Sequence, residues 1–134
     1  MSVAQREIEI ATKAGEPIRV MIVADPGFVG DKVRGIVEAD PRLTLVAQVV
    51  DGVSAVSALR RQVIDAVVLD IGQTEAQIKV TLSRMFRLDP HLKVLMVGSL
   101  SFTNVKISMM GLMEGAAEFL VTPSSHSKRT EKDF

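Results

Sequence analysis

Cysteine is absent from the 134-residue chain, which excludes disulfide bonds, thiolate zinc sites and thiol nucleophiles. A net charge is absent as well, because 16 Lys and Arg residues balance 16 Asp and Glu residues. A chain without net charge has no long-range field that would attract a polyanion. We therefore expect no nucleic-acid partner.

Long apolar stretches are also missing. Residues 1–17 contain no apolar core of the secretory kind, and no later segment reaches the roughly 18 apolar residues of a membrane span. We expect no membrane association and a cytoplasmic location. The sequence indicates one domain at 18–123, preceded by an extension at 1–17 whose weak apolar stripe is compatible with a helix, and followed by a polar tail or linker at 124–134.

Five apolar segments have the length of a strand. Three of them, 18–24, 65–69 and 92–97, are nearly continuous in Val, Ile, Leu and Met, which is typical of strands buried on both faces of a parallel sheet. A further strand is predicted at 117–121. The segment 43–50 alternates apolar with polar residues, which favours a strand at the edge of the sheet.

Helical patterns separate these segments. Apolar residues recur at spacings of three and four, as on one face of a helix. The four stripes are Val29, Val33, Ile36 and Val37; Val56, Leu59 and Val63; Ile78, Leu82, Met85 and Phe86; and Val105, Met109, Leu112 and Met113.

The alternation of strands and helices predicts a doubly wound α/β fold with a five-stranded parallel sheet. With the second strand at an edge, the expected order is 2-1-3-4-5, the flavodoxin-like arrangement. This topology normally adds a fifth helix after the last strand. Because the chain after Pro123 is polar, we expect that helix to be absent or truncated.

Two carboxylates follow strands that flank the point where the strand order reverses. Asp25 follows the first strand and Asp70 the third, and ligands of such sheets bind at this edge. Two carboxylates there could hold Mg²⁺, and one could act as a nucleophile. Simpler roles stay open: Asp25 before Pro26 could cap the next helix, and Asp70 could bond its own turn.

The sequence resembles the receiver domains of bacterial response regulators over 18–124. The resemblance rests on the strings IRVMIVADPGFVGDKVRGIVEADPRLTLVAQVVDG, DAVVLDI and EGAAEFLVTP. Within that family it is most similar to the regulatory domain of the chemotaxis methylesterase CheB. The resemblance implies a CheY-like fold in a two-component phosphorelay. It also implies that Asp70 is the phosphoacceptor and that Asp25 and the carbonyl of Gly72 are ligands of Mg²⁺.

The chain departs from this family at three site positions, and it lacks the Met-Pro and Asp-Gly pairs that usually follow the phosphoacceptor. Ala24 stands at a second acidic position, Gly98 at the switch Thr or Ser, and Thr122 at a lysine that pairs with the phosphoryl group. A neutral side chain cannot replace that cation. Ser99 and Thr122 could compensate in part, and Phe119 matches an aromatic switch position or is simply core.

These departures favour a degenerate receiver, or pseudo-receiver, that works as a protein-interaction module and not as an enzyme beyond weak self-catalysed phosphorylation of Asp70. The expected partners are a histidine kinase, an effector domain or a second copy of the chain. A homodimer would use Ile107, Met110 and Phe119, of which we expect Ile107 and Met110 to be exposed. The alternatives are a functional Mg²⁺-dependent phosphoacceptor and a flavodoxin-like module that binds a small ligand.

Overall fold

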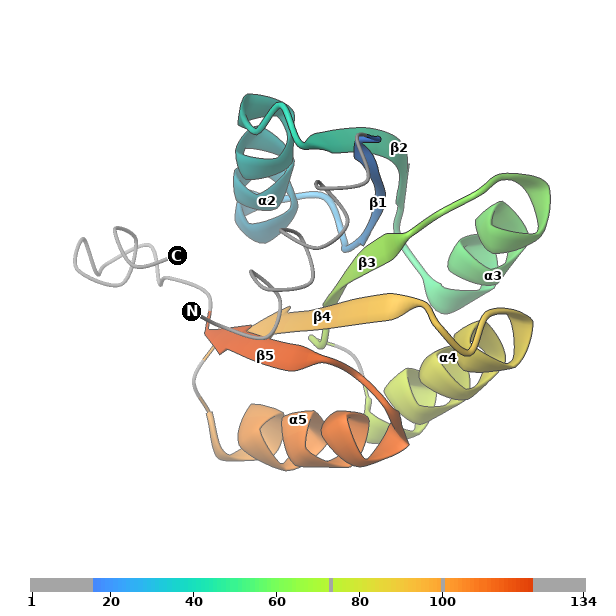
Figure 1. The fold of residues 1–134 in the computed structure, drawn as a ribbon. Helices are drawn as coiled ribbons and strands as arrows, with labels where there is room; N and C mark the ends of the chain where they lie inside the picture. The colour runs from blue at the N-terminus through green and yellow to red at the C-terminus, as the bar shows by residue number, and fades with distance from the viewer. Residues whose placement is uncertain (1–15, 73, 100, 122–134) are drawn as a thin grey trace.

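The computed structural model describes residues 16–72, 74–99 and 101–121. They form a five-stranded parallel sheet in the order β2-β1-β3-β4-β5, which confirms the predicted fold class and strand order (Figure 1). Each strand begins and ends within one residue of its predicted range. The strands are β1 (Ile18–Val23), β2 (Leu43–Val49), β3 (Ala66–Asp70), β4 (Lys93–Gly98) and β5 (Glu118–Val121).

A helix follows each of the first four strands. The helices are α2 (Phe28–Ala39), α3 (Gly52–Arg61), α4 (Glu75–Leu88) and α5 (Phe102–Glu114). Helices α3, α4 and α5 cover one face of the sheet, and α2 packs on the other (Figure 1). The segments 1–15 and 122–134, where we expected a helical extension and a missing fifth helix, lie outside the described residues.

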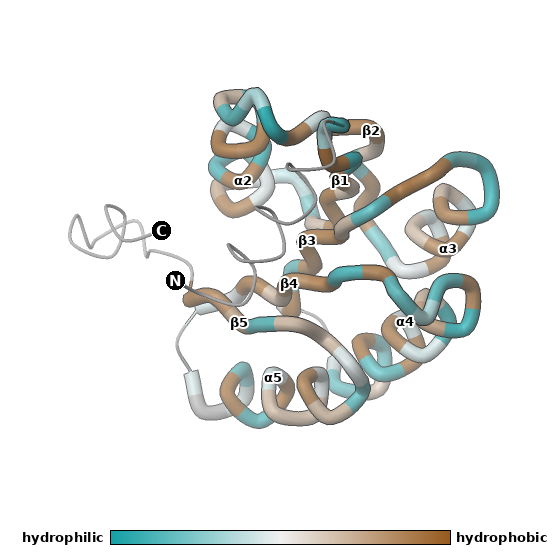
Figure 2. Tube along the Cα trace, viewed as in Figure 1, coloured by the Kyte–Doolittle hydropathy of each residue, from teal (hydrophilic) through white to brown (hydrophobic). Residues whose placement is uncertain are grey.

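The core has two parts, one on each face of the sheet. The larger cluster joins α3, α4 and α5 to strand residues such as Met21, Leu69 and Met96, each of which has no exposed surface. The smaller cluster joins Val33 and Val37 of α2 to β1. Successive strand residues contribute to opposite clusters because side chains alternate across a sheet. Figure 2 shows the hydrophobic residues concentrated along the strands.

The apolar stripe of α5 was predicted wrongly. Met109 and Met113, expected in the core, are 62% and 89% exposed, whereas Ile107, expected at the surface, is only 2% exposed. Met110 is half-buried and packs against the larger cluster. Apolar side chains lie on both faces of this helix, so periodicity alone cannot decide which face packs on the sheet. Gly111 lies against Met96, and this close approach places the Ile107 face on the sheet.

A smaller correction concerns α3. The predicted stripe included Val63, but the helix ends at Arg61 with Gln62 as its C-cap, and the Val63 side chain is 61% exposed. The other members of that stripe, Val56 and Leu59, do pack in the larger cluster. Within the described segments, no helix has the length and apolar character required to cross a membrane.

Candidate functional site

The predicted site lies where β1 and β3 end side by side. The two strands are parallel neighbours in which Val23 pairs with Leu69. Asp25 follows β1 and Asp70 is the last residue of β3, so both reach the same edge of the sheet. The next partners of β1 and β3 are β2 and β4, on opposite sides. The structure therefore places both residues at the reversal of strand order, as the sequence predicted.

Asp70 is half-buried and bonded to its own turn. Its Oδ1 atom accepts a hydrogen bond of 2.9 Å from the backbone N–H of Gly72, which is the Asx arrangement considered from the sequence. Burial raises the pKa of Asp70 above its usual value, the Gly72 hydrogen bond opposes this shift, and the charge of Asp25 adds to it. The two carboxylates are therefore close enough to repel each other.

Asp25 is exposed and does not cap the following helix. Helix α2 begins at Phe28, and its N-cap residue is Gly27, which provides no side-chain hydrogen bond and has a φ of 150° that favours glycine. The predicted capping role of Asp25 is therefore wrong. Its carboxylate makes no hydrogen bond or ion pair with the described residues and is available to a ligand at this edge.

Two of the residues that depart from the receiver pattern, Ala24 and Gly98, are buried and closely packed. Ala24 is 4% exposed and belongs to the apolar cluster beneath α2. Gly98 is buried at the end of β4, and a Cβ atom there would lie 2.8 Å from Cγ1 of Ile71 and 3.3 Å from Nδ2 of Asn104. A larger residue at position 98 would therefore have to displace Ile71, which has no exposed surface.

Ser99 is exposed and is held by the start of α5. Asn104 donates from Nδ2 to the carbonyl oxygen of Ser99 at 2.9 Å and to its Oγ at 3.2 Å. The same residue donates its backbone N–H to the Oγ of Ser101, the N-cap of α5, at 3.0 Å. Sequence reasoning missed Asn104; Ser101 is a readable N-cap residue, but no local pattern indicates that the Asn104 side chain bonds Ser99.

Two further predicted residues lie on β5 or beyond it. Phe119 is half-buried and packs against the larger cluster, so its core role is supported by contacts. Thr122, expected at the position of the family lysine, lies outside the described residues.

The oxygen donors at this edge suit a hard cation only in part. Asp25, Asp70 and the Gly72 carbonyl are the donors predicted for Mg²⁺, which accepts one or two carboxylates and keeps several waters. No group of three or more His, Cys, Asp or Glu side chains among the described residues could hold a metal. The mutual repulsion of Asp25 and Asp70 is the feature that a bound cation would relieve.

Comparison with known proteins identifies the family. The chain is 34% identical over 118 residues to a protein-glutamate methylesterase/protein-glutamine glutaminase of Rhodospirillum centenum, and 37% identical over 111 residues to one of Rhodospirillum rubrum. These matches span 88% and 83% of the chain. No family model matches it.

Solved structures share the fold. The response regulator domain of Thermotoga maritima CheB superposes with a TM-score of 0.72 at 24% identity, over 88% of this chain and 87% of that domain. CheY in a CheX-CheY-BeF3-Mg²⁺ complex from Borrelia burgdorferi gives a TM-score of 0.69 at 27% identity, over 85% and 84%. The chain is a CheB-like receiver domain of the response-regulator type. It spans only about 30% of the length of the methylesterases that it matches.

Proposed function

We propose that this receiver domain is a regulatory protein-interaction module in which Asp70 is phosphorylated weakly or not at all. The observation that supports the proposal is the packing of Gly98 against Ile71, because any side chain at the end of β4, including one with a switch hydroxyl, would require Ile71 to move. The burial of Ala24 in an apolar cluster supports it. The loss of one preorganised polar group that stabilises a transition state typically lowers the rate of reaction by about 10²- to 10³-fold.

Magnesium fits this site as a weak ligand. Asp25, Asp70 and the carbonyl of Gly72 would hold it, and it would supply positive charge beside Asp70. The remaining ligands would be water. The alternative function, a working phosphoacceptor, is favoured by one observation: Asp70 retains an acidic neighbour in Asp25 at the edge of the sheet. In that case Ser99 or Thr122 would compensate for the missing groups.

The partners of the domain are proposed to be proteins. Two structural neighbours are complexes of this kind, CheY6 with the P1 domain of CheA3 from R. sphaeroides and CheY with CheX. A histidine kinase, an effector domain or a second copy of the chain would be bound by the unit 18–123, with 1–17 and 124–134 as flanking segments. The exposed face of α5, formed by Met109, Leu112 and Met113, replaces Ile107 and Met110 as the dimer surface.

The test is a two-dimensional ¹H–¹⁵N NMR spectrum recorded with Mg²⁺ alone and then with Mg²⁺ and beryllofluoride, an acyl-phosphate mimic. We expect small shifts at Asp25 and Gly72 with Mg²⁺ and no slow-exchanging complex with beryllofluoride. The Asp70→Asn variant, which keeps the acceptor for Gly72, is the control. Large beryllofluoride shifts that include Ser99 and vanish in the control would overturn the proposal in favour of the phosphoacceptor.

A further inference from the structure

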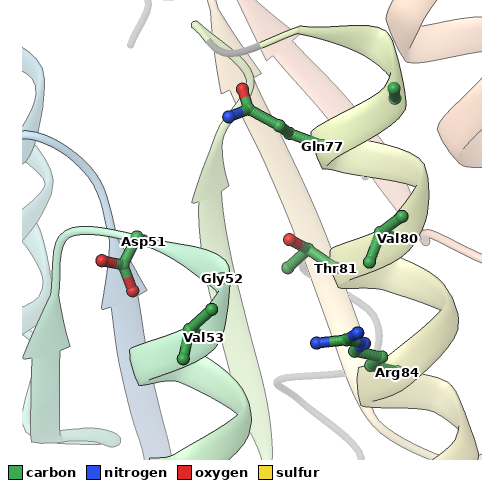
Figure 3. A pocket seen from close by; sticks show the side chains of 8 residues that line it. Asp51, Gly52, Val53, Gln77, Val80, Thr81 and Arg84 are labelled. Atoms are coloured by element: carbon green, nitrogen blue, oxygen red, sulfur yellow. The ribbon is translucent and has the colours of Figure 1, made fainter.

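Helices α3 and α4 are separated at the surface by a groove made of two adjoining hollows. The first, of about 380 Å³, is lined by residues that include Gly52, Val53, Val80 and Arg84 (Figure 3). The second, of about 500 Å³, shares Val53 and Arg84 with it and continues toward the carboxyl ends of both helices. Asp25 and Asp70 line neither hollow. The groove is therefore separate from the receiver site.

Helices α3 and α4 approach each other closely at one end of the groove. A Cβ atom on Gly52 would collide with Thr81, so a glycine at the start of α3 lets the helix approach α4. Beyond this point the helices present apolar side chains to solvent. Val53 is 73% exposed and Val80 50% exposed, and Leu88 at the far end is 43% exposed. Val56 lies beneath them at 7% exposure.

Three arginines line the carboxyl-terminal half of the groove. Arg60 comes from α3, and Arg84 and Arg87 come from α4. All three are exposed, and none makes an ion pair or hydrogen bond with the described residues. Arg60 and Arg87 lie in the last turns of their helices, where the helix dipole favours a cation. Arg84 lies a turn earlier, so the dipole does not account for its position.

The charges of the groove are not balanced by its own acids. Asp51 is the one acidic residue among those that line the two hollows. It lies at the opposite end, where it caps α3 by accepting a 2.7 Å hydrogen bond from the backbone N–H of Ser54. That hydrogen bond lowers the pKa of Asp51. The arginine half of the groove therefore has an uncompensated positive charge next to exposed apolar side chains.

We propose that this groove binds an acidic amphipathic helix of a partner protein. Apolar anchors spaced along such a helix would contact Val53, Val80 and Leu88, and its carboxylates would pair with the arginines, which form bidentate contacts with carboxylates. Nucleic acid is disfavoured because the residues that line the two hollows include valines and no aromatic side chain on which a base could stack. The inference rests on the proposed function only in assigning a protein partner, since it uses neither Asp70 nor the exposed face of α5.

The probe is a synthetic alanine-rich peptide of about 18 residues, long enough to be partly helical in water, with leucines at i, i+3, i+4 and i+7 and four glutamates spaced so that no two are three or four residues apart. Titrated into ¹⁵N-labelled full chain, it should shift the amides of Val53, Ser57, Val80 and Arg84, with a Kd below about 1 mM. The affinity should fall as salt rises. A peptide with lysine in place of glutamate should leave these amides unmoved.

Charge reversal provides the decisive comparison. Arg84→Glu should weaken binding of the acidic peptide by about tenfold. Lys106→Glu makes the same change of charge at an exposed position of α5 and should not alter the affinity. Asp70→Asn should bind like the parent, which separates this inference from the proposed role of the receiver site. No shifts at millimolar peptide, shifts centred elsewhere, or equal shifts with a DNA duplex would each overturn the proposal.

Discussion

A Cβ atom on Gly98 would lie 2.8 Å from Cγ1 of Ile71, inside the distance that two carbon atoms normally keep. Ile71 is also tied to the same strand by its backbone, whose N–H donates to the carbonyl oxygen of Val97 at 2.9 Å. The residue after Asp70 and the last residue of β4 are therefore packed as one unit. This packing decides what can stand at the end of β4.

Substitutions that enlarge position 98 should destabilise the domain. We expect Gly98→Ser to reduce the free energy of unfolding by about 1–3 kcal/mol, because Ile71 is fully buried and can move only by straining its neighbours. Urea unfolding followed by circular dichroism measures the change. An unchanged midpoint would show that the end of β4 can accept a hydroxyl and would weaken the case for a degenerate switch.

A double-mutant cycle tests whether Ile71 causes this effect. Ile71→Ala alone should cost about 2–5 kcal/mol as a large-to-small core change. In that background Gly98→Ser should cost less than in the parent, with a coupling energy of about 0.5–3 kcal/mol. The fully additive result would assign the cost to Asn104, whose Nδ2 is the next nearest atom.

Much of the fold could be predicted because its signals are local. Continuous apolar runs located β1, β3 and β4, and alternation in 43–50 located the edge strand β2. The strand order follows from chain alternation and handedness, so the sequence alone places Asp25 and Asp70 at one edge of the sheet. The family resemblance identified the positions where Ala24 and Gly98 depart from the receiver pattern.

The features that could not be predicted depend on contacts between distant segments. Nothing near Gly98 in the sequence indicates that Ile71 occupies the adjacent space. The groove that the arginines line combines residues of α3 and α4, two helices that β3 separates along the chain. The Asn104 bond to Ser99 depends on a loop whose path is set by packing. Periodicity also cannot choose between two apolar faces of one helix, as α5 shows.

The raised pKa of Asp70 predicts that replacing its carboxylate with a neutral side chain increases the free energy of unfolding, by an amount that depends on pH. A carboxyl whose pKa is raised in the folded state stabilises the fold below its unfolded pKa, and this contribution is lost as pH rises through the folded pKa. Asp70→Asn should therefore be more stable than the parent at neutral pH, and the difference should vanish near about pH 3. The urea midpoints of both proteins across this pH range give the answer; a variant less stable at neutral pH would contradict it.

Asp25 should account for part of that pKa shift. Its charge is one of the causes that raise the pKa of Asp70, after burial. In Asp25→Asn, the side-chain carboxyl of Asp70 should titrate at lower pH than in the parent, as followed by ¹³C NMR. Asp31→Asn, an exposed carboxylate in the first turn of α2, is the control and should leave the titration of Asp70 in place.

The start of α4 contains a complete capping box. Thr74 Oγ1 accepts from the backbone N–H of Gln77 at 3.2 Å, and Gln77 Oε1 accepts from the backbone N–H of Thr74 at 3.1 Å. Thr74→Ala should reduce the free energy of unfolding by about 1 kcal/mol. Ser83→Ala, at an exposed position within the same helix, should change it by no more than about 0.5 kcal/mol. Equal losses would mean that the cap contributes nothing specific.

The two faces of α5 should respond oppositely to the same substitution. Ile107→Lys would bury a charge in the larger cluster, where Ile107 is 2% exposed, and should cost about 3 kcal/mol or more or prevent folding. Met113→Lys, at 89% exposure, should change the free energy of unfolding by no more than about 0.5 kcal/mol. If α5 is a dimer surface, Met113→Lys should also lower self-association in sedimentation equilibrium without any loss of fold. A stable Ile107→Lys protein would mean that the opposite face packs on the sheet, as the sequence pattern first indicated.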